Sequence, residues 1–324
     1  EPVNTCAIGF DVKRFNETEY AQLVADRYQT NHRVETVGQD DFDLIDKLAL
    51  LYDEPYADSS AMPTYRVCEL ARKHVTVALS GDGGDELFAG YRRYKMHLAE
   101  DKVRNTLPLS LRKPIFGPLG KLYPKLDWAP KFLRAKTTFQ SMAMDTVEGY
   151  YNSMSILRAD ERAKLFSKDY QASLNGYSSL EVFRRYGDKV KHLDSMKIAQ
   201  YIDLKTYLVG DILTKVDRAS MAHSLEVRVP ILDHKFVEWA FKTPSEHNLH
   251  NGIGKYSFKH ALEPHLPEDV LYRKKMGFAV PLADWFKGPL KERLYDRLLS
   301  SRMQESGYFN LKQMKKLIDD HVSG

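Results

Sequence analysis

The stretch VTVALSGDGGDELFAGYRRY, from Val75 to Tyr94, decides the fold of this chain. It begins with an uncharged run in which Val75, Val77 and Leu79 are apolar, a pattern typical of a parallel strand covered on both faces. A turn with three glycines follows, and glycine allows the backbone to come close to a ligand. Because ligands bind at the carboxyl ends of strands in open α/β sheets, the sequence predicts a ligand site directly after Leu79.

Three carboxylates, those of Asp82, Asp85 and Glu86, lie within this turn. Their charges repel one another, so a fold that holds them together normally supplies a cation or uses one of them as a base. A magnesium–nucleotide complex would supply that cation. The alternative is structural: Asp82 and Asp85 would form the turn and cap a helix starting near Asp85, where Glu86 would favour the helix dipole. The motif alone does not separate these interpretations.

The first hundred residues alternate strand and helix patterns, which predicts βαβ units around a parallel sheet. After Tyr94 seven prolines and glycines, from Pro108 to Pro130, interrupt a stretch without a clean period, and we interpret it as a linker. From about Thr137 onward helical patterns dominate. We therefore predict an α/β fold in which a partial nucleotide-binding core over residues 1–104 precedes a mainly helical region over residues 105–324.

The composition is that of an ordinary globular chain and excludes several classes of function. Of 324 residues, 43% are hydrophobic and 28% charged. The 48 lysines and arginines outnumber the 44 acids by only four and are spread along the chain, so we expect no nucleic-acid partner. No run approaches the roughly 18 apolar residues that span a bilayer. Two cysteines, Cys6 and Cys68, are consistent with a reducing compartment, and we expect a cytoplasmic protein without a membrane partner.

Five segments, in order along the chain, resemble the asparagine synthetase family, glutamine-dependent amidoligases whose synthetase domain has an ATP pyrophosphatase-type, nucleotide α-hydrolase-like fold. Five ordered motifs are far more specific than any one of them. The segments are DEPYADSSAMPTYRVCELAR (53–72), SGDGGDELFAGYRRY (80–94), DILTKVDRASMAHSLEVRVPILDH (211–234), GIGKYSFKHAL (252–262) and RKKMGFAVPLADWF (273–286).

The resemblance implies three roles at the reacting centre. Asp82 would be the carboxylate nearest the reaction, where it takes a proton from the attacking amine or orients it. Lys255 would stabilise charge on the α-phosphate of ATP and on the departing pyrophosphate. Asp85 would help to hold Mg²⁺.

Further positions are implied to contact the nucleotide or the substrate. Ile8 resembles the adenine-contacting position, and Ser80 and Gly81 resemble backbone contacts to the nucleotide. Asp217 and Arg228 match charged positions that line the synthetase site. Because Arg228 stands among apolar residues, we expect its guanidinium to have a buried partner or a ligand carboxylate.

Lys215 follows Asp211 by four residues, a spacing typical of an ordinary exposed acid–base pair on a helix. Arg273, Lys274 and Lys275 would either add positive potential near the phosphates or form a solvated charge run.

The implied activity is that of a ligase in asparagine biosynthesis. A carboxylate, aspartate first among the candidates, would attack ATP to give an acyl-adenylate and pyrophosphate, and ammonia made from glutamine would displace AMP. Well-studied members tend to have Glu where this chain has Asp82, which is one methylene shorter. A related amidotransferase, a β-lactam-synthetase-like enzyme and a non-catalytic scaffold therefore remain alternatives, and a homodimer is left open.

Two parts of the family pattern do not occur in this sequence. One is the SGGxDS loop that binds ATP phosphates after the first strand of the domain, and TCAIGF (5–10) resembles the strand that follows it. The other is the N-terminal glutaminase domain with its cysteine nucleophile, since Cys6 lies in a predicted strand. We expect a fragment of a longer protein that alone binds ATP weakly and makes no product.

Overall fold

The computed structural model describes residues 1–11, 16–38, 43–124, 130, 135–273 and 280–324. Six strands are present in these ranges, in three two-stranded sheets. The strands are β1 (Asn4–Phe10), β2 (Asn31–Val37), β3 (Val77–Leu79), β4 (Glu226–Arg228), β5 (Leu249–His250) and β6 (Ile253–Gly254). The pairs β1–β2 and β3–β4 are parallel, and β5–β6 is antiparallel.

The predicted parallel pairing is confirmed, but the strands do not form one continuous sheet. Within the described residues β1 pairs only with β2, and β3 pairs only with β4. Strand β4 comes from the part of the sequence that was expected to be mainly helical. The two parts of the chain are therefore joined through backbone pairing of β3 with β4, which the helical periodicity of the second part concealed.

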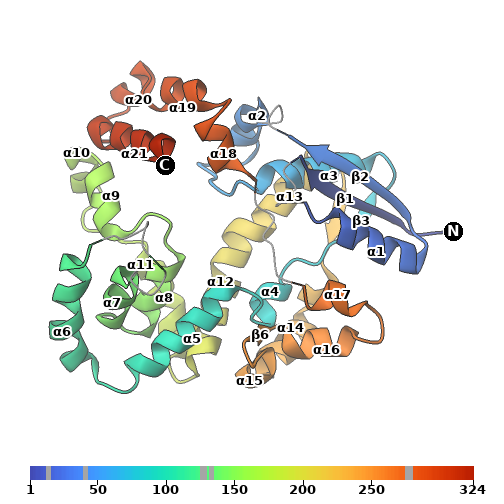
Figure 1. Ribbon diagram of the computed structural model, residues 1–324, viewed down its shortest axis with the longest axis horizontal. Coiled ribbons are helices and arrows are strands. Elements are labelled where there is room, and N and C mark those ends of the chain that lie inside the picture. The colour runs from blue at the N-terminus through green and yellow to red at the C-terminus, as the bar shows by residue number, and fades with distance from the viewer. Residues whose placement is uncertain (12–15, 39–42, 125–129, 131–134, 274–279) are drawn as a thin grey trace.

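The helices of the first hundred residues confirm the predicted alternation with β1, β2 and β3. These helices are α1 (Thr18–Tyr28), α2 (Leu44–Leu51), α3 (Ala61–Arg72), α4 (Gly84–Leu87) and α5 (Arg92–Arg104). Helix α3 packs against β1, β2 and α13 (Thr214–Met221), and these elements lie side by side at the upper right of Figure 1. Its Tyr65, Cys68 and Ala71 belong to one core with Ile8 of β1 and Leu225 before β4. A single core thus covers both parallel sheets.

A second core lies among the helices that follow α4. Tyr94, Tyr150 and Met196 are fully buried there and come from three different helices. The helical elements between residues 105 and 213 are α6 (Leu109–Leu122), α7 (Lys136–Met142), α8 (Thr146–Met154), α9 (Ala159–Leu165), α10 (Lys168–Ser173), α11 (Leu180–Gly187), α12 (Ser195–Lys205) and a π-helical segment (Leu208–Leu213).

Helix α6 corrects the prediction of a linker between residues 105 and 130. It contains Pro114 and Pro118, which lack the backbone N–H that a helix interior requires. Tertiary packing overrides this local cost. At Gly120 a Cβ would lie 2.9 Å from Gln140 Cγ of α7, so glycine permits the close approach of the two helices. Arg112 is buried and donates to the Met144 carbonyl at 3.0 Å, which fixes α6 to the end of α7.

The remaining helices lie at two opposite ends of Figure 1. The lower group, coloured orange, surrounds the hairpin of β5 and β6, and the upper group, coloured red, packs beside α9. Their bounds are α14 (His234–Lys242), α15 (Ser245–Asn248), α16 (Tyr256–Leu262), α17 (Glu268–Leu271), α18 (Leu282–Lys287), α19 (Lys291–Leu298), α20 (Ser301–Glu305) and α21 (Leu311–Ser323). None of the helices in the described ranges has the length and apolar character needed to cross a membrane.

Candidate active site

A cavity of about 1020 Å³ lies between the edges of β1 and β3, with α3 and α13 forming further walls. Its apolar part is lined by side chains such as Val3 of the β1 side, Val67 of α3 and Val216 of α13. Its polar part lies where β3 ends. The polar residues that line the cavity include Asp58, Ser59, Ser60, Ser80, Asp82, Asp85, Tyr91, Tyr207 and Lys215. The cavity therefore opens at the carboxyl end of β3, where the sequence predicts a ligand.

The turn after β3 is shaped by glycines. Gly83 has φ +85°, and a Cβ there would lie 2.3 Å from Leu232 Cδ2, so any other residue would meet both strain and a clash. A Cβ at Gly90 would lie 2.0 Å from Asp85 Oδ1 and 2.4 Å from Lys255 Cε. Gly90 thus leaves the space in which Asp85 and Lys255 meet.

Lys255 reaches the turn from the hairpin of β5 and β6. It has a left-handed φ of 57° and stands at the start of α16, and its N–H donates to the Phe88 carbonyl at 2.8 Å. Lys255 Nζ lies 3.1 Å from Asp85 Oδ2, and both side chains are about one quarter exposed. The structure therefore brings together two predicted site residues that are 170 positions apart in the sequence. Helix α4, which carries Asp85, lies at the centre of Figure 1.

Asp82 and Ser80 both line the cavity, and the Ser80 hydroxyl donates to Asp82 Oδ2 at 2.5 Å. Cys68 of α3 lies behind them. Burial, and then the charge of Asp82, raise the pKa of the Cys68 thiol to about 12, so this cysteine stays neutral. Asp82 is thus a carboxylate held at the cavity wall by a hydroxyl donor, a position from which it can accept a proton or orient an amine.

Glu86, the third carboxylate of the turn, does not face this cavity. It is 1% exposed and accepts a hydrogen bond of 2.6 Å from the Tyr91 hydroxyl. Burial raises its pKa above the ordinary range of a glutamate, against the effect of the Tyr91 hydrogen bond. The prediction of three crowded carboxylates therefore resolves into two that line the cavity and one that packs inside.

The cavity wall also carries an ion pair that the sequence analysis missed. Lys215 Nζ donates to Asp58 Oδ2 at 2.8 Å and to Ser60 Oγ at 2.7 Å, and we call these three residues the Lys215 cluster. Burial opposes the ionisation of Asp58, but the charge of Lys215 and hydrogen bonds from Lys215 and Ser60 lower the pKa of this carboxyl below its usual value. All three residues line the cavity.

This arrangement corrects the expectation of an exposed pair between Asp211 and Lys215. Lys215 is 6% exposed, and its partner is Asp58 of the loop before α3. Asp211 accepts a hydrogen bond of 2.5 Å from the Tyr56 hydroxyl. The residues from Leu208 to Leu213 form a π-helical segment, and such segments change the direction of side chains and are frequent at functional sites. The spacing of four residues predicts a pair only in a regular α-helix, and Asp211 lies in the π-helical segment instead.

Ile8, Asp217 and Arg228 are not among the residues that line the cavity, whereas Gly81 stands between Ser80 and Asp82, which line it. Ile8 is buried in the core beneath β1, and a Cβ at Gly81 would meet nothing within 4 Å. Asp217 is exposed on α13. Arg228 corrects the expectation of a buried partner, because its side chain is 64% exposed and pairs with Glu226 at 2.7 Å. Its neighbours along the strand are apolar, but a strand directs successive side chains to opposite faces.

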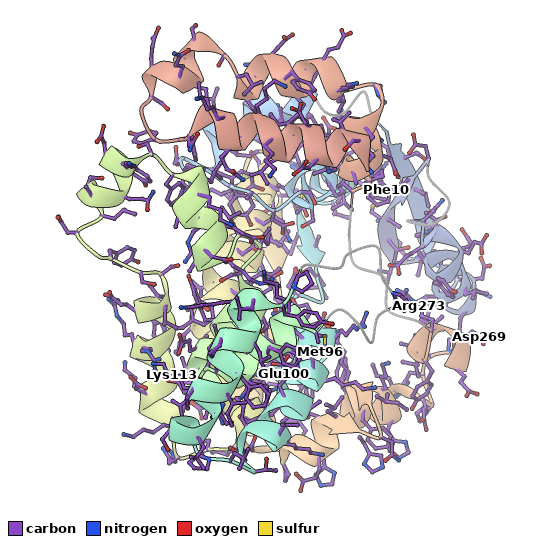
Figure 2. The ribbon with its side chains drawn as sticks, turned by 60° about the vertical axis from the view of Figure 1, so that its left-hand side comes forward. Phe10, Met96, Glu100, Lys113, Asp269 and Arg273 are labelled. Carbon is purple, nitrogen blue, oxygen red and sulfur yellow. The ribbon has the colours of Figure 1, made fainter. Side chains whose placement is uncertain are left out.

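Arg273 belongs to another edge of the cavity. Its guanidinium pairs with Glu17, a residue that lines the cavity, and lies 4.8 Å from the centre of the Tyr20 ring. Figure 2 shows Arg273 beside the blue helix α1. Lys274 and Lys275 lie outside the described residues.

The donor groups fit a metal that arrives with phosphates. Within the described ranges no three histidine, cysteine, aspartate or glutamate side chains are grouped closely enough to hold a metal ion. Mg²⁺ is usually bound by one or two carboxylates together with substrate phosphates. Asp85, with Asp82 on the same cavity, would supply such carboxylates.

Comparison with known proteins decides the family. The family described as asparagine synthase matches residues 1–324. The chain belongs to this family. Over 322 residues it is 32% identical to glutamine-hydrolyzing asparagine synthetase 1 of Bacillus subtilis (strain 168), which covers 99% of this chain and 49% of that protein.

Two further relatives agree. A putative glutamine-hydrolyzing asparagine synthetase of Mycobacterium tuberculosis (strain H37Rv) is 33% identical over 331 residues, covering 99% of this chain and 47% of the relative. A putative glutamine-hydrolyzing asparagine synthetase 2 of Methanocaldococcus jannaschii is 34% identical over 220 residues, covering 68% of this chain and 40% of the relative. The chain thus spans about half the length of the curated relatives it matches, and the predicted family is confirmed.

Proposed function

We propose that this chain is the synthetase part of an asparagine synthetase, a ligase that joins ammonia to the side-chain carboxylate of aspartate at the expense of ATP. The observation that carries the proposal is the meeting of Asp85 and Lys255 at the rim of a cavity that Asp82 also lines. A cation and two carboxylates around one cavity suit a magnesium-bound triphosphate and an amine nucleophile. We further propose a nucleotide α-hydrolase-like core, a cytoplasmic location and ammonia supplied by a glutaminase domain.

The first step is attack of the aspartate side-chain carboxylate on the α-phosphorus of ATP. A P–O bond to the β-phosphate breaks, pyrophosphate leaves, and an acyl-adenylate forms. Negative charge grows on the phosphoryl oxygens, so Lys255 would act mainly by electrostatic stabilisation. Mg²⁺, when bound, would supply further charge neutralisation at the phosphates, with Asp85 as its carboxylate ligand. In the free protein the Asp85–Lys255 pair keeps both groups in place before the nucleotide separates them.

The second step is attack of ammonia on the acyl carbon. Asp82 would accept a proton from the attacking amine, or orient it, and the C–O bond to AMP would break. The Ser80 hydroxyl holds the carboxylate of Asp82 and thereby limits its rotation. Both steps use groups that line the same cavity.

The apolar part of the cavity suits an additional strand. Exposed apolar side chains line the cavity at β1 and β3: Val3, just before β1, at 68%, and Val77 and Leu79 of β3 at 41% and 72%. Within the described residues β1 pairs only with β2 and β3 only with β4, so each of them has a second edge at which a further strand can pair. We propose that a strand leading into a phosphate-binding loop occupies this position in the active enzyme, and that the chain without it binds ATP weakly.

A second candidate is a related amidotransferase that activates another carboxylate. The short side chain of Asp82 favours it, because the loss of one methylene can displace a reacting group by about 1 Å, which can reduce the rate about 100-fold for the original acceptor. A non-catalytic scaffold would release no pyrophosphate with any acceptor.

The test is pyrophosphate release from MgATP by the whole polypeptide that carries this chain, with ammonia and a series of carboxylates. We expect release that depends on aspartate. We expect Asp82→Asn to lose at least about 100-fold of this activity, and the exposed Asp26→Asn on α1 to retain it. Release that requires a different carboxylate would support the related amidotransferase, and no release with any carboxylate would overturn the proposal.

A further inference from the structure

The Lys215 cluster has no part in the two chemical steps, although it lines the same cavity as Asp82 and Asp85. Lys215 lies on α13, and Asp58 and Ser60 come from the loop before α3. The cluster is therefore a separate polar wall built from elements distant in sequence.

The ion pair of this wall is poorly explained as a stabilising device. Removing two opposite charges from water costs about as much as their attraction returns, and apolar residues often replace such pairs without loss of stability. Val216, next to Lys215 on α13, and Val67 of α3 add apolar side chains to the same cavity, which lowers the hydration of the charged pair. A charged pair at such a position is better explained by a ligand that needs it.

The groups of the cluster favour a ligand that carries both charges. Lys215 has three N–H donors, of which two go to Asp58 and Ser60, and among the described contacts the third has no acceptor. Asp211 adds a second carboxylate beside Asp58, so two acids surround one lysine. An ammonium group would be attracted by the acids, and a carboxylate would be attracted by the lysine.

We propose that the Lys215 cluster binds the α-amino and α-carboxylate groups of the acceptor amino acid, with Asp58 accepting from the ammonium and Lys215 donating to the carboxylate. This inference rests on the proposed function, because the other carboxylate of the acceptor must reach Asp82 and Lys255. A cavity of about 1020 Å³ has room for an amino acid beside a nucleotide, since pockets of roughly 300–1,000 Å³ hold drug-sized ligands. Asp217 and Arg228, both exposed, are thereby replaced as the residues that recognise the acceptor.

The test combines two variants with two analogues of aspartate in the pyrophosphate-release assay. Succinate lacks the α-amino group, and β-alanine lacks the α-carboxylate. We expect Asp58→Asn to reduce kcat/KM for aspartate about 10- to 100-fold and to change the value for succinate less than about 3-fold. We expect Lys215→Met to reduce kcat/KM for aspartate by a similar factor and to leave that for β-alanine nearly unchanged. The KM for ATP should not move in either variant.

A matched control is Asp53→Asn. Asp53 forms an exposed pair of 3.5 Å with Arg218 between the same two parts of the chain, and its positive φ of 57° suits asparagine. We expect all three substrates to react with this variant as with the wild type.

Equal losses of kcat/KM for aspartate and succinate in Asp58→Asn, together with equal losses for aspartate and β-alanine in Lys215→Met, would show a structural role and overturn the inference. If the variants do not fold, the wild type alone decides, because equal kcat/KM values for aspartate, succinate and β-alanine would exclude recognition of the two α-groups. Absence of aspartate-dependent release from the wild type would instead overturn the proposed function itself.

Discussion

Networks of charged side chains occur in two regions of this molecule, at the cavity and in the helical core, and their surroundings differ. At the cavity, Lys215 pairs with Asp58 and Lys255 pairs with Asp85, and each pair includes groups that line the open space. In the helical core, Asp203 is 0% exposed, and its Oδ2 accepts hydrogen bonds from Arg93, Tyr94 and Tyr150.

Burial of a charge therefore does not by itself identify a functional site. Three protein donors converge on Oδ2 of Asp203, so this carboxylate holds helices α5, α8 and α12 together. The pairs at the cavity have protein on one side and space for a ligand on the other. Substitutions in the cavity should therefore change activity more than stability, and substitutions in the helical core should do the reverse.

The largest effect is expected for Lys255→Ala. Loss of the ammonium removes the cation nearest the developing phosphoryl charge, and pyrophosphate release should fall by about 10²- to 10³-fold or more. The midpoint of chemical denaturation should change little, because the Lys255 side chain is partly exposed. Lys259→Ala, one turn along α16, is the control and should keep wild-type activity. Wild-type rates in Lys255→Ala would contradict the assignment of the cavity as the reacting centre.

Asp203→Asn should reduce the free energy of unfolding more than it reduces activity. It removes the charge that balances Arg93 in a buried network, and losing one partner of a buried pair costs about 3–5 kcal/mol of unfolding free energy. Urea denaturation followed by circular dichroism measures this loss. Glu226→Gln, in an exposed ion pair on β4, should cost less than about 1 kcal/mol. An Asp203→Asn protein as stable as the wild type would remove the distinction between the two regions.

The helical core should also respond to pH through His97. Its ring is 1% exposed, and Arg104 donates to Nδ1 at 3.3 Å. Burial, and then the charge of Arg104, lower the pKa of His97 to about 4. An unfolded histidine, with a pKa of about 6.5, binds a proton that the folded one does not, so the contribution is complete above pH 6.5 and is lost as pH falls from there toward 4.

The measurement is the free energy of unfolding of wild type and His97→Gln at pH 7 and pH 5. The difference between the two proteins should change by about 2 kcal/mol, at about 1.4 kcal/mol per pH unit over the titrating range. A difference that is the same at both pH values would show that folding does not lower the pKa of His97.

The smallest effect is expected for Arg228→Ala. The side chain is 64% exposed, and an exposed ion pair contributes about 0–1 kcal/mol. The free energy of unfolding should therefore change by no more than about 1 kcal/mol. The KM for the acceptor should stay within about threefold of the wild-type value. A large rise in the KM for aspartate would instead restore Arg228 as a substrate-binding residue.

The sequence predicted those features that depend on local pattern. Strand β3, the glycine turn and the short helix that carries Asp85 appear where composition and periodicity placed them, and β1 lies where the resemblance of TCAIGF placed a strand. The meeting of Asp85 with Lys255 could be predicted only through the family resemblance, since no pattern relates positions so far apart. The family itself is confirmed by the match over residues 1–324.

The missed features depend on tertiary contacts. Helix α6 forms despite Pro114 and Pro118, because packing against α7 compensates for lost backbone hydrogen bonds. The Lys215 cluster requires the π-helical segment that precedes α13 and the loop of Asp58, and the sequence shows neither their geometry nor their contact.

Transfer of oxygen from the substrate carboxylate to AMP shows whether this cavity activates the carboxylate by adenylation. The whole polypeptide would be supplied with MgATP, ammonia and aspartate labelled with ¹⁸O in the side-chain carboxylate. We predict that one labelled oxygen appears in each AMP formed, because the attacking carboxylate oxygen stays on the phosphorus when ammonia breaks the C–O bond. AMP without label, or label in inorganic phosphate, would contradict the account.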